Sequence, residues 1–266
     1  MQTVLYQRDI RRPLPEPGEA EYIFLLDQIK NSSSFIFPEY FAFHSALETE
    51  ESFLNYSSYA LEWLKTLSAE KEARGTLIVG GSLLLLNSDK VYNSTPIFFE
   101  AEQVGSYQKQ RLFGHEIGRV EKGSGYTVIK HPVTYEKWGF LICADVFIPG
   151  VFENYRDCDN IAIPTSSPFR EVDSEQERKK RDFEIFVRGA SESNSTIFKC
   201  CSVGQVGKDT GKALAPRLQG RSLIANRSRV IDSAPGIHWS GAISFFKDLT
   251  TTRMNFSDSY EAATID

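Results

Sequence analysis

Cysteine and histidine are scarce in this chain of 266 residues, which contains four of each. Four cysteines in so long a chain do not make a disulfide framework, so we expect reduced thiols. The spacing of the cysteines and histidines matches no zinc-binding motif. With 41% hydrophobic and 24% charged residues, the composition is that of an ordinary globular protein that buries a large core.

A long hydrophobic run is also missing. The longest nearly apolar stretch, residues 76–86, carries Gly80, Gly81 and Ser82 and is shorter than the ~20 residues that span a bilayer. The first ten residues include polar and charged side chains and are followed by three prolines, which does not fit a signal peptide. We therefore expect no membrane association and a cytoplasmic location.

Basic residues are not in excess, since 30 Lys and Arg face 35 Asp and Glu and the net charge is −5. Phosphate binding needs a concentrated positive field, so a general nucleic-acid binder is excluded. The one dense basic cluster, residues 178–181, follows Glu175 and Glu177 and indicates a solvated helix face. The glycine-containing segment 207–213 lacks the first glycine and the Ser/Thr of a phosphate-binding loop.

No linker, repeat or low-complexity tract divides the middle of the chain, so we expect one domain over residues 1–266. Residues 245–266 are expected to be either a flexible tail or a segment that contacts a second subunit.

Apolar spacing predicts alternating helices and strands. Helices are expected at 19–30, 51–70 and 174–194, and strands at 4–6, 35–37, 76–86, 96–99, 105–108, 126–130, 139–143, 161–163, 197–203, 222–225 and 230–231. In the third helix, Phe183, Phe186, Val187 and Ala190 are expected to face inward. Helices separated by apolar strands predict an α/β layered protein.

Cys143 is the first candidate functional residue, because it ends the expected strand 139–143. A thiol at a strand end can be reached by substrate while the buried strand fixes its direction. Glu39 follows the apolar run 35–38 in the same way, and Lys109 follows the expected strand 105–108. Taken singly, the three residues are more simply an inert thiol, a solvated carboxylate and a surface cation. Together they offer a nucleophile, a general base and a cation for an oxyanion.

Three segments carry a resemblance to a known family, namely Phe37-Pro38-Glu39, Tyr107-Gln108-Lys109-Gln110-Arg111-Leu112-Phe113 and Gly139-Phe140-Leu141-Ile142-Cys143-Ala144-Asp145. In order and spacing they resemble the Glu, Lys and Cys motifs of the nitrilase superfamily, also called carbon-nitrogen hydrolases. The similarity continues through residues 188–194, 202–207 and 220–224, and so spans about residues 4 to 232.

This resemblance implies a four-layer α-β-β-α sandwich that commonly forms homodimers and uses no metal or organic cofactor. It implies that Glu39, Lys109 and Cys143 are catalytic and that the Ala144 backbone N–H helps to hold the oxyanion. Family members also carry a second glutamate between the Lys and Cys motifs. Glu116 is the nearer match and Glu121 the second, with a role in positioning substrate or Lys109.

The expected activity is hydrolysis of an amide or carbamoyl amide of a small molecule through a thioester. Nitrile hydrolysis and acyl transfer by the same site remain open, as does a non-catalytic scaffold whose site is covered by residues 164–177. The family often has an aromatic residue where this chain has Ala144, and an Asn-Pro segment where this chain has residues 163–169. The substrate therefore stays unassigned at this stage.

Overall fold

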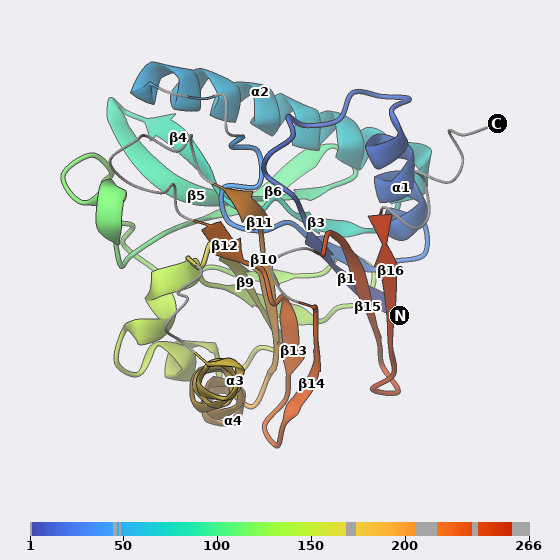
Figure 1. The fold of residues 1–266 in the computed structure, drawn as a ribbon, viewed down its shortest axis with the longest axis vertical. Coiled ribbons are helices and arrows are strands. Elements are labelled where there is room, and N and C mark those ends of the chain that lie inside the picture. Colours follow the sequence, from blue (N-terminus) through green and yellow to red (C-terminus); the bar gives the residue numbers. More distant parts are fainter. Residues whose placement is uncertain are drawn as a thin grey trace.

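Two β-sheets packed face to face form the centre of the molecule, and helices cover their outer faces (Figure 1). The computed structural model describes residues 2–44, 47, 49–168, 174–205, 217–235 and 239–256. The segments 207–213 and 257–266 and residues 169–173 of the proposed covering loop lie outside these ranges. Within the described residues no helix has the length and hydrophobicity needed to cross a bilayer.

The first sheet has eight strands in the order β16-β15-β1-β2-β3-β5-β4, with β6 pairing β5. Its strands are β1 (Gln2–Gln7), β2 (Ser34–Ile36), β3 (Leu77–Val79), β4 (Leu83–Asn87), β5 (Lys90–Phe99), β6 (Glu102–Gln108), β15 (Gly241–Phe246) and β16 (Thr251–Asn255). Helices α1 (Ala20–Ile29) and α2 (Glu50–Ala69) cover its outer face (Figure 1). Thr49 caps the N-terminus of α2, since its side chain accepts a hydrogen bond from the backbone N–H of Ser52.

The second sheet has six strands in the order β14-β13-β10-β9-β8-β7. Its strands are β7 (Val128–Lys130), β8 (Lys137–Phe140), β9 (Asn160–Thr165), β10 (Thr196–Cys201), β13 (Leu223–Ala225) and β14 (Val230–Ser233). The outer helical layer on this side comprises α3 (Glu175–Asp182), a π-helical turn (Phe183–Val187) and α4 (Arg188–Ser193). A separate two-stranded ribbon joins β11 (Val203–Gln205) to β12 (Arg217–Gln219).

Side chains that alternate along the strands divide the core into layers, because successive residues of a strand point to opposite faces. Leu5 and Ile36 belong to the cluster that contacts the second sheet, together with Phe140. Their neighbours Val4 and Phe35 belong to the cluster beneath α1 and α2. The α/β class predicted from the sequence is therefore confirmed, with the layers in the order helix, sheet, sheet, helix.

The strand expected over residues 76–86, with a glycine interruption, is two separate strands, β3 and β4. The chain turns at Gly80 and Gly81 between β3 and β4, and both strands pair with β5. Gly81 has φ +59°, and a Cβ on it would lie 2.1 Å from the carbonyl oxygen of Pro38. Only glycine fits such a turn. Because Gly81 has no side chain, the loop that follows β2 can pack closely against this turn.

Phe183 does not face inward as expected, since it is 52% exposed, whereas Phe186, Val187 and Ala190 are buried. The π-helical turn inserts one extra residue per turn and changes which face of the helix each position occupies.

Of the expected tail, the structure describes residues 245–256. There β15 pairs with β1 and with β16 in the chain's own sheet, and neither of these two late strands was predicted. Contact of this segment with a second subunit stays a prediction.

Candidate active site

Glu39 lies in the loop that leaves β2 and is 2% exposed. The backbone of this loop is held against the turn between β3 and β4, with Phe37 N–H donating to Val79 O at 3.0 Å and Tyr40 N–H to Ser82 O at 3.1 Å. Tyr40 has φ +54°, a backbone conformation that residues other than glycine adopt at a cost in free energy. The loop thus directs the carboxylate of Glu39 into the interior.

Lys109 follows β6 directly and is also 2% exposed. Its backbone is held between two segments, because Lys109 N–H donates to Asn93 O at 2.9 Å and Gly123 N–H donates to Lys109 O at 2.8 Å. Its ammonium nitrogen lies 2.7 Å from Oε1 of Glu39. The structure therefore brings the first two candidate residues into direct contact.

Glu116 is the glutamate that the structure places in the site. It sits in the 3-10 turn Gly114–Glu116 and is 1% exposed, and its Oε2 lies 2.9 Å from the Lys109 ammonium. The hydroxyl of Tyr40 and the amide of Asn93 each donate to its Oε1 at 2.6 Å. The alternative, Glu121, is half exposed and pairs with Lys90 at 3.7 Å. Glu121 is thus not part of the site.

Cys143 does not end a strand as expected, because β8 ends at Phe140 and Cys143 is the first residue of the 3-10 turn Cys143–Phe147. Its backbone has φ +44°, which for a residue with a side chain costs about 1–3 kcal/mol. The residue is partly exposed and its sulfur is 3.9 Å from Ser166 O, while the N–H of Ser166 donates to Oε2 of Glu39 at 2.8 Å. The strained turn therefore presents the thiol to the carboxylate.

The charges of the site set the protonation of each group. Burial raises the pKa of Cys143 well above its ordinary value, the negative charge of Glu39 raises it further, and the cation of Lys109 lowers it in part. Burial lowers the pKa of Lys109, but the charges of Glu39, Cys143 and Glu116 outweigh burial and the pKa ends above its usual range. Burial raises the pKa of Glu116, yet Lys109 and the donated hydrogen bonds leave it lowered. At neutral pH the site holds a neutral thiol beside a fixed cation.

Asp145 fixes the turn after Cys143 through four hydrogen bonds. Its Oδ2 accepts from Ile142 N–H at 3.0 Å and from the hydroxyl of Tyr107 at 2.8 Å. Its Oδ1 accepts from Gln110 N–H at 3.0 Å and Arg111 N–H at 2.7 Å. One carboxylate thus joins the turn of the thiol to the loop of the lysine.

The other three cysteines lie outside the site's polar contacts. Cys158, Cys200 and Cys201 are buried and unpaired, as expected for structural thiols. Cys200 contacts the backbone oxygens of Tyr6 and Ile36 in the first sheet. Across the described residues, no three or more His, Cys, Asp or Glu side chains are grouped so as to hold a metal ion.

Three residues of the site were not found from the sequence. The backbone N–H of Ser166 donates to Oε2 of Glu39 at 2.8 Å, and Asn93 donates to Glu39 at 3.1 Å as well as to Glu116. Tyr40, which follows Glu39 directly, holds Glu116. Ala144 is 4% exposed and lies next to the thiol in the turn, where its N–H was expected to serve.

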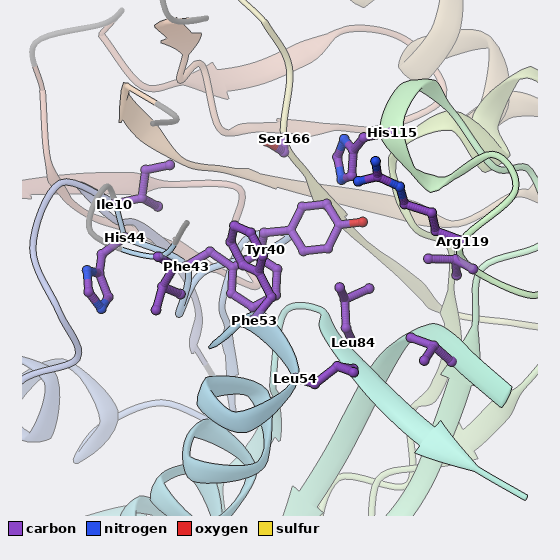
Figure 2. A pocket seen from close by; sticks show the side chains of 13 residues that line it. Ile10, Tyr40, Phe43, His44, Phe53, Leu54, Leu84, His115, Arg119 and Ser166 are labelled. Carbon is purple, nitrogen blue, oxygen red and sulfur yellow. The ribbon is translucent and has the colours of Figure 1, made fainter. Parts of the chain in front are cut away.

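Two cavities meet near the thiol. One of about 270 Å³ is lined by Cys143 and Ala144, by the aromatic rings of Phe113 and Phe147, and by Ser166. A second, of about 400 Å³, also reaches Ser166 but extends past Tyr40 (Figure 2). The site is therefore open to a small molecule from the side of the thiol.

A buried carboxylate and ammonium in contact, with a thiol beside them, lie on loops at the edge of two packed sheets. The family model for carbon-nitrogen hydrolases matches residues 29–160, which include the three candidate catalytic residues. The chain therefore contains a carbon-nitrogen hydrolase domain. No curated protein sequence matches the chain.

Solved structures share the fold at low sequence identity. Nit3 of Saccharomyces cerevisiae, a member of branch 10 of the nitrilase superfamily, is 17% identical with TM-score 0.70, covering 100% of this chain and 94% of that one. An amidase from Nesterenkonia sp. is 16% identical with TM-score 0.72, covering 99% and 94%. A further structure of that amidase shows covalent addition of the acetamide moiety of fluoroacetamide at the active-site cysteine.

A larger enzyme contains a similar domain. The glutamine-dependent NAD+ synthetase of Acinetobacter baumannii is 18% identical with TM-score 0.69, covering 95% of this chain. The chain spans only 47% of the length of that synthetase.

Proposed function

We propose that the chain hydrolyses a non-peptide carbon-nitrogen bond, in an amide or carbamoyl amide of a small molecule, through a thioester on Cys143. The observation that carries the proposal is the position of Glu39. Its carboxylate lies 2.7 Å from the Lys109 ammonium and accepts a hydrogen bond from the backbone of Ser166, whose carbonyl oxygen is 3.9 Å from the thiol sulfur. A base, a nucleophile and a cation set close together are the groups that acyl transfer requires.

In the first half of the reaction, Glu39 takes the thiol proton as the sulfur of Cys143 attacks the carbonyl carbon. The carbonyl π electrons move to oxygen, and the ammonium of Lys109 with the N–H of Ala144 stabilises this oxyanion. When the oxyanion collapses, the carbon-nitrogen bond breaks and Glu39 gives its proton to the departing nitrogen. An amine or ammonia leaves, and the acyl group stays as a thioester.

In the second half, Glu39 takes a proton from water as the water oxygen adds to the thioester carbon. Collapse of this second oxyanion breaks the carbon-sulfur bond, and the leaving sulfur takes the proton back from Glu39. The acid is released and the resting thiol is restored. Acyl transfer differs only in that an amine replaces water, and nitrile hydrolysis starts from the same attack.

The protonation of the site supports this sequence. Because the pKa of Cys143 is raised, the thiol is neutral at rest and loses its proton to Glu39 only as it attacks. Because the pKa of Lys109 is raised, its positive charge persists through both halves. Glu116, which holds the other side of that ammonium, positions Lys109 without touching the thiol proton.

The solved relatives support a small-molecule amide over the alternatives. In the amidase from Nesterenkonia sp. AN1 the active-site cysteine takes up the acetamide moiety of fluoroacetamide covalently, which supports a nucleophilic role for Cys143. In the described part of the loop, Ser166, Ser167 and Pro168 line a cavity beside the thiol, which favours an enzyme over a non-catalytic scaffold. The homodimer and the single domain stay predictions.

The test is a panel of amides, carbamoyl amines and nitriles, assayed for release of acid and of amine or ammonia. Cys143→Ala should abolish release, and intact-protein mass spectrometry of the wild type should find the acyl mass on the peptide that holds Cys143. Cys158→Ala, a buried cysteine away from the site's polar contacts, is the matched control and should keep activity. Full activity in Cys143→Ala would refute the proposal.

A further inference from the structure

An apolar chamber lies next to the candidate active site, on the side of Glu39. Its volume is about 400 Å³, within the usual range for a small-molecule site. Its walls come from the loop after β2, from α2 and from β4 and β5. They include the rings and aliphatic side chains of Tyr40, Phe43, Phe53, Leu54, Leu84 and Val91 (Figure 2).

Contacts among its wall residues give the chamber a defined shape. The rings of Tyr40 and Phe43 are stacked, with centroids 5.1 Å apart and planes 13° from parallel. The ring centroids of Phe43 and of Phe53 in α2 are 4.8 Å apart. The hydroxyl of Tyr40 is held by its bonds to Glu116 and Asn93, so its ring is fixed by the polar site itself.

Ser166 connects the chamber to the reacting atoms. Its N–H is 2.8 Å from Glu39 Oε2 and its carbonyl oxygen is 3.9 Å from Cys143 Sγ. Ser166 lines both the chamber and the cavity of about 270 Å³. Cys143 lines the cavity of about 270 Å³ but not the chamber.

This placement separates the two ends of a substrate. The acyl group becomes bonded to Cys143, so its substituent occupies the cavities of about 270 and 80 Å³ that Cys143 lines. The departing nitrogen receives its proton from Glu39, so its substituent points toward the Glu39 side. Resting on the proposed function, we infer that the chamber binds an apolar group on the nitrogen, and that the preferred substrates are N-alkyl or N-arylalkyl amides that release an apolar amine.

The polar residues of the chamber agree with an uncharged occupant. His115 and Arg119 are exposed and lie together at one side of the chamber (Figure 2). The Arg119 cation repels a positively charged substituent at that side. On the other side His44 lies among the apolar side chains, where burial lowers its pKa.

The test compares acetamide with its N-methyl, N-ethyl, N-propyl and N-benzyl derivatives, which share one acyl group. For the wild type, kcat/KM for amine release should rise about fourfold with each methylene buried. Val91→Phe, which narrows the chamber, should lower the ratio of kcat/KM for N-benzylacetamide to that for acetamide at least tenfold. Val128→Phe, the same change on an exposed strand residue, should leave this ratio as in the wild type.

A binding measurement keeps the inference testable if none of these amides is hydrolysed. N-benzylacetamide should bind the Cys143→Ala protein by ligand-observed NMR, and the additional substitution Val91→Phe should remove binding while Val128→Phe does not. The inference is overturned if kcat/KM does not rise along the series of N-substituted acetamides. It is also overturned if N-benzylacetamide does not bind, or binds equally well with and without Val91→Phe. Hydrolysis of acetamide with a flat series overturns the chamber's role alone. Binding without any hydrolysis by the wild type overturns the proposed function alone.

Discussion

The backbone N–H of Arg111 donates to Oδ1 of Asp145 at 2.7 Å, and this bond ties the loop after Lys109 to the turn that begins at Cys143. The same carboxylate accepts three further bonds, from Gln110, Ile142 and Tyr107. Asp145 is fully buried, so no water replaces a lost acceptor. The relative position of the thiol and the ammonium therefore depends on a residue outside the reaction.

Asp145→Asn should destabilise the protein by about 1–3 kcal/mol. The substitution replaces one accepting oxygen by an NH₂ group, which then faces buried N–H or O–H donors and leaves them without an acceptor. Turnover should fall with it, since the turn of Cys143 and the loop of Lys109 lose their common anchor. Urea denaturation and kcat measure the two effects. The control is Asp157→Asn on an exposed loop, and equal behaviour of the two variants would show that Asp145 anchors nothing.

Glu39→Gln should reduce turnover by about 10²–10⁴-fold, the contribution of a general acid-base group. The same substitution should make the thiol of Cys143 easier to alkylate, although turnover falls. The charge of Glu39 raises the pKa of Cys143, so its removal should move the pH profile of alkylation to lower pH. Glu121→Gln at the surface is the control. A profile that moves to higher pH would contradict the assigned contact.

Iodoacetamide should modify Cys143 before the other three thiols, because Cys143 is partly exposed and Cys158, Cys200 and Cys201 are buried. The rate should be low at neutral pH and should still rise above pH 9, since burial and Glu39 raise the thiol pKa above its ordinary value of 9.0. Peptide mapping after timed alkylation measures this. A plateau near pH 7 would mean that the resting residue is a thiolate.

Lys109→Met should destabilise the protein by about 3–5 kcal/mol, the cost of breaking a buried pair and leaving charge uncompensated. The variant keeps two buried carboxylates, Glu39 and Glu116, without their cation. Lys90→Met, which removes the exposed partner of Glu121, should change stability by less than about 0.5 kcal/mol. Chemical denaturation at pH 7 compares them, and similar losses would contradict the burial argument.

The stability due to Glu116 should depend on pH. Its pKa in the folded protein is lowered from 4.5 by Lys109 and by hydrogen bonds from Tyr40 and Asn93, against the opposing effect of burial. A lowered pKa contributes stability that is fully present above the unfolded value and is lost as pH falls through the folded value. The difference in unfolding free energy between wild type and Glu116→Gln should therefore be largest above about pH 5 and should shrink on acidification. A difference that is constant from pH 7 to pH 3 would rule out this linkage.

Local sequence predicted the three central residues because each follows an apolar run on its own segment. Strands carry such residues to a sheet edge, and the order of the motifs assigned Glu39, Lys109 and Cys143 before any contact was known. The choice between Glu116 and Glu121 needed the fold, since both follow Lys109 within twelve residues. Only the 3-10 turn at Glu116 and the surface pairing of Glu121 separate them.

Residues positioned by pairing between distant segments could not be predicted in this way. Asn93 reaches the site because the register of β5 and β6 places Ser94 opposite Gln108, next to Lys109. β15 owes its place to pairing with β1, more than 230 residues earlier in the chain, and its own sequence gave no strand signal strong enough. Phe183 was placed on the wrong face because the apolar spacing assumed regular helical turns, which the π-helical turn interrupts.

The bond from Ser166 to Glu39 comes from a peptide group, so it does not depend on which side chain stands at position 166. Nineteen of the twenty encoded amino acids would keep that donor, and proline alone lacks it. Evolution is thus free to exchange the side chain at the junction of the two cavities while the acid-base machinery stays intact. Substitutions of Ser166 other than proline should therefore reshape the two cavities that it lines and leave the hydrogen bond to Glu39 in place.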